Sequence, residues 1–343
     1  MKPLVLNLLT CSVTAALLVA LALPAKHTLD AAREAAPPPP APEAPWPRPD
    51  PHPRRAFGVY VDPWHIDDWA RRVGAAPQLV AKFEAFSNDR TIDKWLVQSR
   101  RIGIRRVLVS WEPWQPVPAS YGSALQAQPQ PGYRNIDIAR GAQDRYMLRF
   151  ARSLARFKGT VWLRFAHEMN GYWYPWSRNP RAYVLAWRRM VRIFDAAGAR
   201  NVRFVWSVNP NLYEDEATWR RGLRPYWPGR RYVDAIGSTA INFGGLKEYP
   251  IRRIEPRLRR LRSDYRKPIV LTETNTAYAD RVQWLADLRA LLERSPWIRV
   301  VAWSQLPSRG KVHQRGTGTV DWDAQSDPPA AGALRAIIGD GLE

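Results

Sequence analysis

The chain has 343 residues, enough for one barrel of about 250 residues with extensions or for two smaller domains. Hydrophobic residues make up 45% of it, so most of the chain can bury a core; its single cysteine excludes disulfides, and its five scattered histidines show no metal-ligand spacing, so we expect no metal and no other cofactor. The net charge is +21, but no recognition motif accompanies it, so nucleic acid is not an expected partner.

The N-terminal segment has the features of an export signal. A basic start at Lys2 precedes an apolar run of ~20 residues and the small-residue site Ala20-Leu21-Ala22. Residues 1–25 are therefore expected to be a signal peptide or, because the run is long enough to span a bilayer, an uncleaved N-terminal anchor. Residues 26–55 are rich in Ala and Pro, which favours an extended linker. We expect the body of the protein to be exported: periplasmic, secreted or anchored at the cell surface.

From Ala56 onward, short apolar runs alternate with amphipathic segments. Eight runs are predicted to be strands, at residues 57–62, 80–86, 105–111, 160–166, 202–207, 233–239, 268–273 and 298–304. Continuous apolar strands with helices between them favour an α/β fold, a single (β/α)8 TIM barrel. The alternative, a doubly wound sheet, would need a Gly-rich phosphate-binding turn after an early strand, and the sequence has none. We assign residues 56–327 to the barrel and 328–343 to a C-terminal tail, and we expect a monomer.

Two helices between these strands have clear apolar stripes. The first is predicted at 139–157, with its stripe at Met147, Phe150, Ala151, Leu154 and Phe157. The second is predicted at 180–197, where Asn179 caps the start, Pro180 occupies the first turn and Gly198 ends the helix. Both helices would cover the outside of the barrel.

The segment 250–267 predicts a third helix with an unusual charge. It carries eight cations, namely Arg252, Arg253, Arg257, Arg259, Arg260, Arg262, Arg266 and Lys267. Only Glu255 and Asp264 are acidic, and eight cations cannot share one face at 3.6 residues per turn. Two interpretations remain open. The cations form a solvated surface, or they form a basic patch that attracts an anionic polymer or a membrane surface in a salt-sensitive way.

Two glutamates follow apolar strands at one end of the predicted barrel. Glu168 comes after the strand at 160–166, and Glu273 ends the strand at 268–273. Catalytic groups of such barrels lie at the carboxyl ends of the strands. Cleavage of a glycosidic bond needs two facing carboxyls, one to protonate the leaving oxygen and one to attack the sugar carbon or activate water. The pair therefore indicates a glycoside hydrolase.

Several motifs support the same interpretation. The most specific runs from Leu163 to Trp176, LRFAHEMNGYWYPW, and the others are Gly141-Ala142-Gln143-Asp144, Trp206-Ser207-Val208-Asn209, Tyr226-Trp227-Pro228-Gly229, Tyr232-Val233-Asp234 and Lys267-Pro268. In this order they resemble glycoside hydrolase family 26, a β-mannanase family of the retaining clan with its acid/base on strand four and its nucleophile on strand seven. The resemblance extends from about Gly58 to about Trp303.

The resemblance implies a role for each matching residue. Glu168 matches the acid/base and Glu273 the nucleophile of the family. Arg164, His167 and Trp173 match positions beside the cleaved bond, and Trp176 is expected to border the same cleft. Trp303, at the end of the eighth strand, matches an aromatic floor beneath the reacting sugar. If Arg164 lies within a few ångströms of Glu273, its positive charge would keep Glu273 ionised, as a nucleophile must be.

One departure from the family leaves the substrate open. A tyrosine that hydrogen-bonds the nucleophile in the family falls at Ile241 in this chain. The resemblance thus implies a retaining endo-β-glycanase, with β-1,4-mannan as the first candidate. A mixed-linkage β-glucan, a β-xylan or the cell's own exopolysaccharide are alternatives with the same mechanism. A non-catalytic polysaccharide-binding barrel is the alternative from another class, although it does not require both glutamates.

Overall fold

The computed structural model describes residues 55–88, 91–116, 128–210, 215–242, 249–276, 281–304, 312–314, 318–320 and 324–339. The expected signal segment and linker, at 1–25 and 26–55, lie outside these residues except for Arg55. None of the helices that could be searched in the described part of the chain is long and apolar enough to cross a bilayer.

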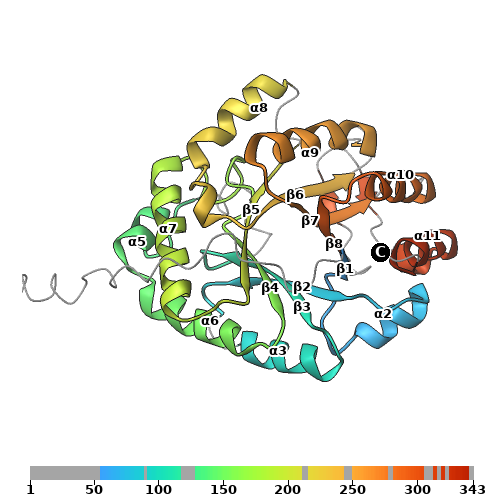
Figure 1. Ribbon diagram of the computed structural model, residues 1–343, viewed down its shortest axis with the longest axis horizontal. Coiled ribbons are helices and arrows are strands. Elements are labelled where there is room, and N and C mark those ends of the chain that lie inside the picture. The colour runs from blue at the N-terminus through green and yellow to red at the C-terminus, as the bar shows by residue number, and fades with distance from the viewer. Residues whose placement is uncertain are drawn as a thin grey trace, which may run out of the picture. The chain divides into compact units, whose positions relative to one another are not determined.

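Eight parallel strands close into a barrel in their order along the chain, and helices surround them (Figure 1). The strands are β1 (Ala56–Val59), β2 (Leu79–Ala85), β3 (Arg106–Glu112), β4 (Thr160–Phe165), β5 (Val202–Val208), β6 (Ala235–Asn242), β7 (Ile269–Thr276) and β8 (Ile298–Trp303). The predicted (β/α)8 barrel is therefore confirmed, and each predicted strand overlaps an observed one. Strands β6 and β7 extend three residues beyond their predicted ends, so Glu273 lies within β7 rather than at its end.

The helices cover the outside of the barrel. Those between the strands are α2 (Ile66–Val73), α3 (Ile92–Arg101), α5 (Asn135–Arg140), α6 (Asp144–Arg156), α7 (Pro180–Ala196), α8 (Glu216–Leu223), α9 (Ile251–Tyr265) and α10 (Arg281–Glu293). Short 3-10 turns at Arg224–Tyr226 (η2) and Arg230–Tyr232 (η3) connect α8 to β6. A two-stranded ribbon, β9 (Val312–Gln314) with β10 (Gly318–Val320), follows β8.

The helix termini follow the sequence signals closely. The side chain of Asn179 accepts a hydrogen bond of 3.0 Å from the backbone of Ala182 and so caps α7. The predicted helix 139–157 is divided, because Gly141 adopts a φ of +103° that ends α5 before α6 begins. Asp144 then forms an ion pair of 2.5 Å with Arg189 of α7. The motif 141–144 therefore serves the packing of helices, not the site.

The expected C-terminal tail begins with a helix of the barrel. Residues Pro328–Gly339 form α11, which packs against α2 and α10. Leu334, Ile337 and Ile338 of this helix are buried in the main core. The boundary that we expected at residue 327 is thus wrong, because the apolar face of α11 covers the outside of the barrel like the other helices.

The two faces of the strands bury different sets of side chains. Residues such as Leu108, Trp162, Val205 and Val300 form a small apolar cluster inside the barrel. Residues of the opposite parity join the helices in a much larger outer core. Because side chains alternate along a strand, the next inward positions toward the carboxyl ends are those that can line a site. They are occupied by the polar or aromatic residues Phe83, Ser110, Glu112, Arg164 and Ser207.

Candidate active site

The first carboxyl, Glu168, lies in a strained turn directly after β4. Ala166 and Glu168 both have left-handed backbones, with φ of +44° and +51°, and such conformations cost about 1–3 kcal/mol each for residues other than glycine. The Glu168 N–H donates to the carbonyl of Ser207 on β5 at 2.9 Å. This turn fixes the backbone of Glu168 and directs its carboxyl to the mouth of the barrel.

Among the described residues, the side chains that donate hydrogen bonds to Glu168 are all uncharged. Trp173 Nε1 donates to Oε2 at 3.1 Å, Asn209 Nδ2 donates to Oε1 at 3.1 Å, and the hydroxyl of Thr239 makes a short contact with Oε1. Burial and the nearby Glu273 carboxylate raise the pKa of Glu168, while Arg164, Thr239 and Asn209 lower it in part. The balance favours a protonated Glu168.

The second carboxyl, Glu273, is held by a buried cation. Arg164 Nη2 donates to Glu273 Oε2 at 3.0 Å, and the arginine is fully buried whereas the Glu273 side chain is 13% exposed. Arg164 also donates to Ser207 Oγ at 2.8 Å and to Ser110 Oγ at 3.2 Å. Burial lowers the pKa of Arg164, but the charges of Glu273, Tyr60 and Glu168 and the hydrogen bond to Glu273 together outweigh burial and raise the pKa overall. The guanidinium thus remains a fixed positive charge.

Thr239 connects the two carboxyl groups and was not predicted from the sequence. Its hydroxyl contacts Glu168, lies 3.5 Å from Arg164 Nη2, and its backbone pairs in register with Glu273 across β6 and β7. Thr239 has the inward parity of Ala235 along β6. The register shift between Ser238 and Thr239 skips Thr272 of β7 and so brings Glu273 opposite Thr239. Ile241, the position of the family tyrosine, pairs instead with Asn275, farther along β7.

Asn209 is positioned by a second asparagine. The side chain of Asn170 donates to the carbonyl of Asn209 and accepts from its N–H, both at 2.9 Å. This pair ties the loop after β4 to the end of β5. The sequence contained a signal for Asn209, because it ends the motif Trp206-Ser207-Val208-Asn209, but we did not assign it to the site.

Trp173 is the only predicted tryptophan that contacts a carboxyl of the site in the described residues. It is half-buried and donates to Glu168. A Cβ added to Gly171 would lie 2.6 Å from the Trp173 ring, so glycine is needed there for the indole to reach Glu168. The expected place of Trp173 beside the acid/base therefore fits the geometry.

His167 and Trp176 lie behind the site. His167 is fully buried, and its Nε2 shares a hydrogen bond of 2.9 Å with the hydroxyl of Tyr174. Burial, with Arg164 nearby, lowers the pKa of His167 well below its usual range, so the ring is neutral. Trp176 is 1% exposed and stacks on Tyr174 at 4.3 Å. Trp176 packs against Tyr174 rather than facing the opening, so our expectation that it borders the cleft is wrong, whereas the place of His167 beside the cleaved bond stays a prediction.

Trp303 does not form a floor beneath the site. Val300 and Ala302 face the inside of the barrel, whereas Val301 and Trp303 face the helices. The Trp303 ring is fully buried and lies 6.5 Å from Trp284 of α10, edge to face. The expected stacking role is therefore contradicted by the parity of β8, and Trp303 is a packing residue of the outer core.

Exposed aromatic residues lie near the carboxyl ends of three strands. In the described part of the chain, the exposed large aromatic side chains are Trp64, Phe83 and Tyr172; Trp64 and Tyr172 follow β1 and β4, and Phe83 lies near the end of β2. The Phe83 ring stacks on Tyr60 at 5.0 Å and lies 5.8 Å from His167. We did not predict a site role for any of these three residues, because a single aromatic residue near a strand end has no distinctive spacing in the sequence.

A third carboxyl, Glu112, ends β3 near the same site. It is 7% exposed and accepts a hydrogen bond of 3.2 Å from Trp114 Nε1. Burial raises the pKa of Glu112 to about 7, which Trp114 opposes and Glu273 reinforces. Among the described residues, no group of three His, Cys, Asp or Glu side chains is close enough to hold a metal ion. The site is therefore built from carboxyls, one arginine and neutral donors.

Known proteins share this architecture and part of this sequence. Residues 145–244 match the model of glycosyl hydrolase family 26. Endoglucanase H of Acetivibrio thermocellus is 26% identical over 249 residues, covering 68% of this chain and 24% of that protein. Mannan endo-1,4-beta-mannosidase A and B of Caldalkalibacillus mannanilyticus is 34% identical over 86 residues, covering 22% of this chain and 15% of that protein. This chain thus spans a quarter or less of the length of these relatives.

The fold has counterparts among solved structures. A GH26 β-mannanase from Bacteroides ovatus superimposes with a TM-score of 0.55 at 18% identity, covering 83% of this chain and 89% of that one. At this identity the likeness concerns the fold. The match over 145–244 includes Glu168, Trp173, Asn209 and Thr239, and so spans most of the contacts described around the first carboxyl.

Proposed function

Because the chain belongs to glycoside hydrolase family 26, a family of retaining enzymes, we propose that it is a retaining endo-β-glycanase acting on a β-linked polysaccharide. The observation that carries the proposal is the pair of carboxyls near the carboxyl ends of β4 and β7. Glu168 accepts hydrogen bonds from neutral donors, and Glu273 pairs with a buried arginine. Such a difference in surroundings is what separates an acid from a nucleophile in glycosidases.

In the first step, Glu273 Oε attacks the anomeric carbon and the bond to the leaving oxygen breaks. Glu168 gives its proton to that oxygen, so the departing chain leaves as an alcohol and the sugar becomes an ester of Glu273. In the second step, Glu168, now a carboxylate, takes a proton from water while the water oxygen attacks the same carbon and displaces Glu273. Two inversions give net retention, and no cofactor is required.

Arg164 and Thr239 position the reacting groups. Arg164 remains charged and holds Glu273 at 3.0 Å, so a fixed positive charge faces the carboxylate that departs in the second step. Thr239 and Asn209 hold one oxygen of Glu168, and Trp173 holds the other. The acid/base is thus fixed in place throughout both steps.

The exposed aromatic residues favour a polymer as the substrate. Trp64, Phe83 and Tyr172 lie near the carboxyl ends of three strands, where flat rings can pack against the C–H faces of several successive sugars. We place β-1,4-mannan first, because of the likeness to mannan-cleaving relatives. A β-glucan is the second candidate, supported by the likeness to an endoglucanase and by Ile241 in place of the family tyrosine.

The test is product analysis with the purified protein. We expect β-1,4-mannan or glucomannan to be cut into short oligosaccharides whose new reducing ends are β when first formed, as followed by proton NMR. Mixed-linkage β-glucan and β-xylan are the comparison substrates. New reducing ends that are α would contradict retention, and binding of these polymers without any cleavage would favour the non-catalytic barrel.

We also propose that the protein is exported, on the basis of the apolar segment within 1–25 and the proline-rich linker at 26–55. Cell fractionation of the full chain, followed by N-terminal sequencing, tests this. Recovery in the cytoplasm with an intact, membrane-free N-terminus would contradict it.

A further inference from the structure

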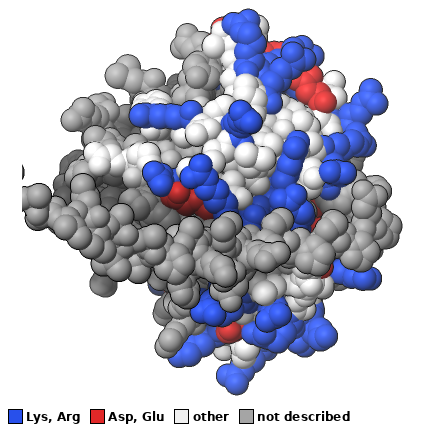
Figure 2. All heavy atoms as spheres, turned by 90° about the vertical axis from the view of Figure 1, so that its left-hand side faces the viewer, with Lys and Arg blue, Asp and Glu red and all other residues white. Residues whose placement is uncertain are grey.

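Several basic side chains that the sequence places on the surface are paired with acids or buried. On the side of the molecule that carries α5 and α7, Lys and Arg are scattered with few acids between them (Figure 2). On α9, however, Arg259 pairs with Glu255 at 2.7 Å and Arg260 pairs with Glu216 at 3.0 Å. Arg257 is buried beneath the Trp219 ring, and Lys267 is buried as well. A diffuse patch on α9 is therefore a weak basis for binding.

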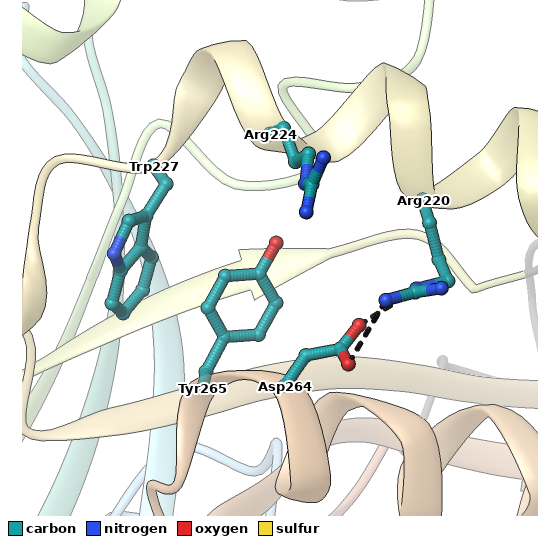
Figure 3. A pocket seen from close by; sticks show the side chains of 5 residues that line it. All are labelled: Arg220, Arg224, Trp227, Asp264 and Tyr265. Atoms are coloured by element: carbon teal, nitrogen blue, oxygen red, sulfur yellow. Dashed lines mark hydrogen bonds and ion pairs between the residues drawn. The ribbon is translucent and has the colours of Figure 1, made fainter.

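A pocket beside α9 offers a more defined basis. It has a volume of about 250 Å³ and lies in the outer wall between α8, η2 and α9 (Figure 3). Its lining residues are Arg220, Arg224, Trp227, Asp264 and Tyr265. None of them contacts Glu168 or Glu273 in the described residues, so the pocket is separate from the candidate active site.

Two donors in this pocket are not engaged by the described residues. The guanidinium of Arg224 and the hydroxyl of Tyr265 point toward one another in Figure 3, and neither makes a hydrogen bond within the described part of the chain. Burial and Asp264 raise the pKa of Tyr265 to about 12, although Arg224 and Arg220 oppose them. The phenol is thus protonated at neutral pH, and the pocket offers one charged and one neutral donor side by side.

The remaining walls offer an acceptor and an aromatic face. Asp264 is fixed by Arg220, which donates to both carboxylate oxygens at 2.8 and 3.1 Å. The Trp227 and Tyr265 rings lie 4.5 Å apart, and each is braced by the buried Trp206 at 5.1 Å. Because these rings are already packed, a ligand would meet a preformed wall and would not need to order it.

We propose that this pocket binds one uronate residue of an acidic polysaccharide. Arg224 and the Tyr265 hydroxyl donate to the sugar carboxylate, in the geometry that a guanidinium favours. Asp264 accepts from a sugar hydroxyl, and the Trp227 ring covers a C–H face of the ring. A small inorganic anion would use only the two donors and leave the aromatic wall uncovered. The site anchors an acidic chain on the outer wall and does not depend on the proposed hydrolysis.

The test is calorimetric titration of the purified protein with hexagalacturonate, using the Glu273→Ala variant so that cleavage cannot interfere. We expect Arg224→Ala to weaken binding at least about tenfold, a loss of about 1.4 kcal/mol or more. Arg221→Ala is the matched control, because it removes the same charge three residues away, from the end of α8, but lies outside the pocket. The Arg221→Ala substitution should change the affinity for hexagalacturonate less than about twofold, since exposed charges are well screened.

Two further ligands test whether binding needs both the carboxylate and the sugar ring. Methyl-esterified hexagalacturonate keeps the rings but lacks the charge, and inorganic phosphate has the charge without the ring; both should bind at least about tenfold more weakly than the free acid. Equal losses in Arg221→Ala and Arg224→Ala would overturn the proposal in favour of a diffuse field. Phosphate or a DNA duplex that binds as tightly as the uronate and loses affinity equally in Arg224→Ala would overturn the assignment to sugar. Melting temperatures of both arginine variants report on folding.

Discussion

The two carboxyl groups at the mouth of the barrel have contrasting surroundings. Glu273 is joined to a fully buried cation, Arg164, whose other nitrogens bind serine hydroxyls. In the part of the chain that the structure describes, Glu168 receives hydrogen bonds from neutral groups of Thr239, Trp173 and Asn209, and burial raises its pKa. A neighbouring cation favours an ionised carboxyl, whereas burial favours a protonated one. Two identical side chains are thus given different chemical roles by their neighbours.

The largest expected effects come from removing each carboxyl in turn. Glu168→Ala should lower polysaccharide cleavage by roughly 10²–10⁴-fold, the usual contribution of a general acid. Glu273→Ala should lose at least as much, because no ester can form. With an aryl β-glycoside, whose leaving group needs no acid, added azide should rescue both variants in distinct ways. Glu168→Ala should give the β-glycosyl azide and Glu273→Ala the α-glycosyl azide, and NMR identifies both products.

The assignment of acid/base and nucleophile would be contradicted if the two azide products were exchanged. A β-azide from Glu273→Ala and an α-azide from Glu168→Ala would show that the two roles are reversed. Circular dichroism spectra and melting temperatures of both variants serve as controls, because both side chains lie at the mouth and outside the apolar core.

The next effect concerns the cation beside Glu273. Arg164→Met should lower the free energy of unfolding by about 3–5 kcal/mol, because it leaves a partly buried carboxylate without its partner. Urea denaturation measures the change. The double variant Arg164→Met with Glu273→Gln should recover much of the loss, since no charge then remains unpaired. Additive losses in the double variant would mean that Arg164 stabilises the fold mainly through Ser110 and Ser207.

The barrel and its strand-end glutamates could be predicted from the sequence, because continuous apolar strands and the segment 163–176 carry strong local signals. What could not be predicted was the direction of side chains. Trp303 matched an expected position, yet the alternation along β8 turns it toward α10. Glu273 lies opposite Thr239 because of an irregularity in the β6–β7 register, and such irregularities have no signature in a single sequence.

The predicted end of the barrel at residue 327 was wrong for a similar reason. The segment 328–343 has few charges and many alanines, which gave no clear stripe, yet α11 buries Leu334 and Ile337 against the barrel. Tertiary packing decided its place, not the local pattern. Sequence reasoning therefore located the chemistry at β4 and β7 but not the residues, such as Asn209 and Thr239, that distinguish the two carboxyls.

Glu112 extends the comparison to a third carboxyl. Its pKa is raised from an ordinary 4.5 to about 7, chiefly by burial, so the folded state holds a proton that the unfolded state releases. The contribution of Glu112 to stability should therefore be complete below about pH 4.5 and should be lost as pH rises to about 7, by about 3 kcal/mol at 1.36 kcal/mol per pKa unit. Glu112→Gln mimics the protonated form and should therefore be more stable than the wild type at pH 8 but equal to it at pH 4.

Melting temperatures at the two pH values measure this difference. Glu293→Gln on α10 is the matched control, because its side chain is 63% exposed and should show no such dependence on pH. If Glu112→Gln changes the melting temperature equally at pH 4 and pH 8, Glu112 is not protonated in the folded state near neutrality.

The smallest expected effect is a change in the pKa of Glu168. The Thr239 hydroxyl lowers the pKa of Glu168, against the raising effects of burial and Glu273, because it donates to the carboxylate. Thr239→Val removes the hydroxyl with little change in shape, so the pKa of Glu168 should rise further. The acid form would then persist to higher pH, and the basic limb of the pH profile of kcat/KM should move upward by up to about one unit, as one hydrogen bond of about 1 kcal/mol implies. Thr272→Val is the control, since that buried hydroxyl contacts Ser207 and not Glu168. A basic limb that moves to lower pH in Thr239→Val, or moves equally in Thr272→Val, would show that the limb reports a group other than Glu168.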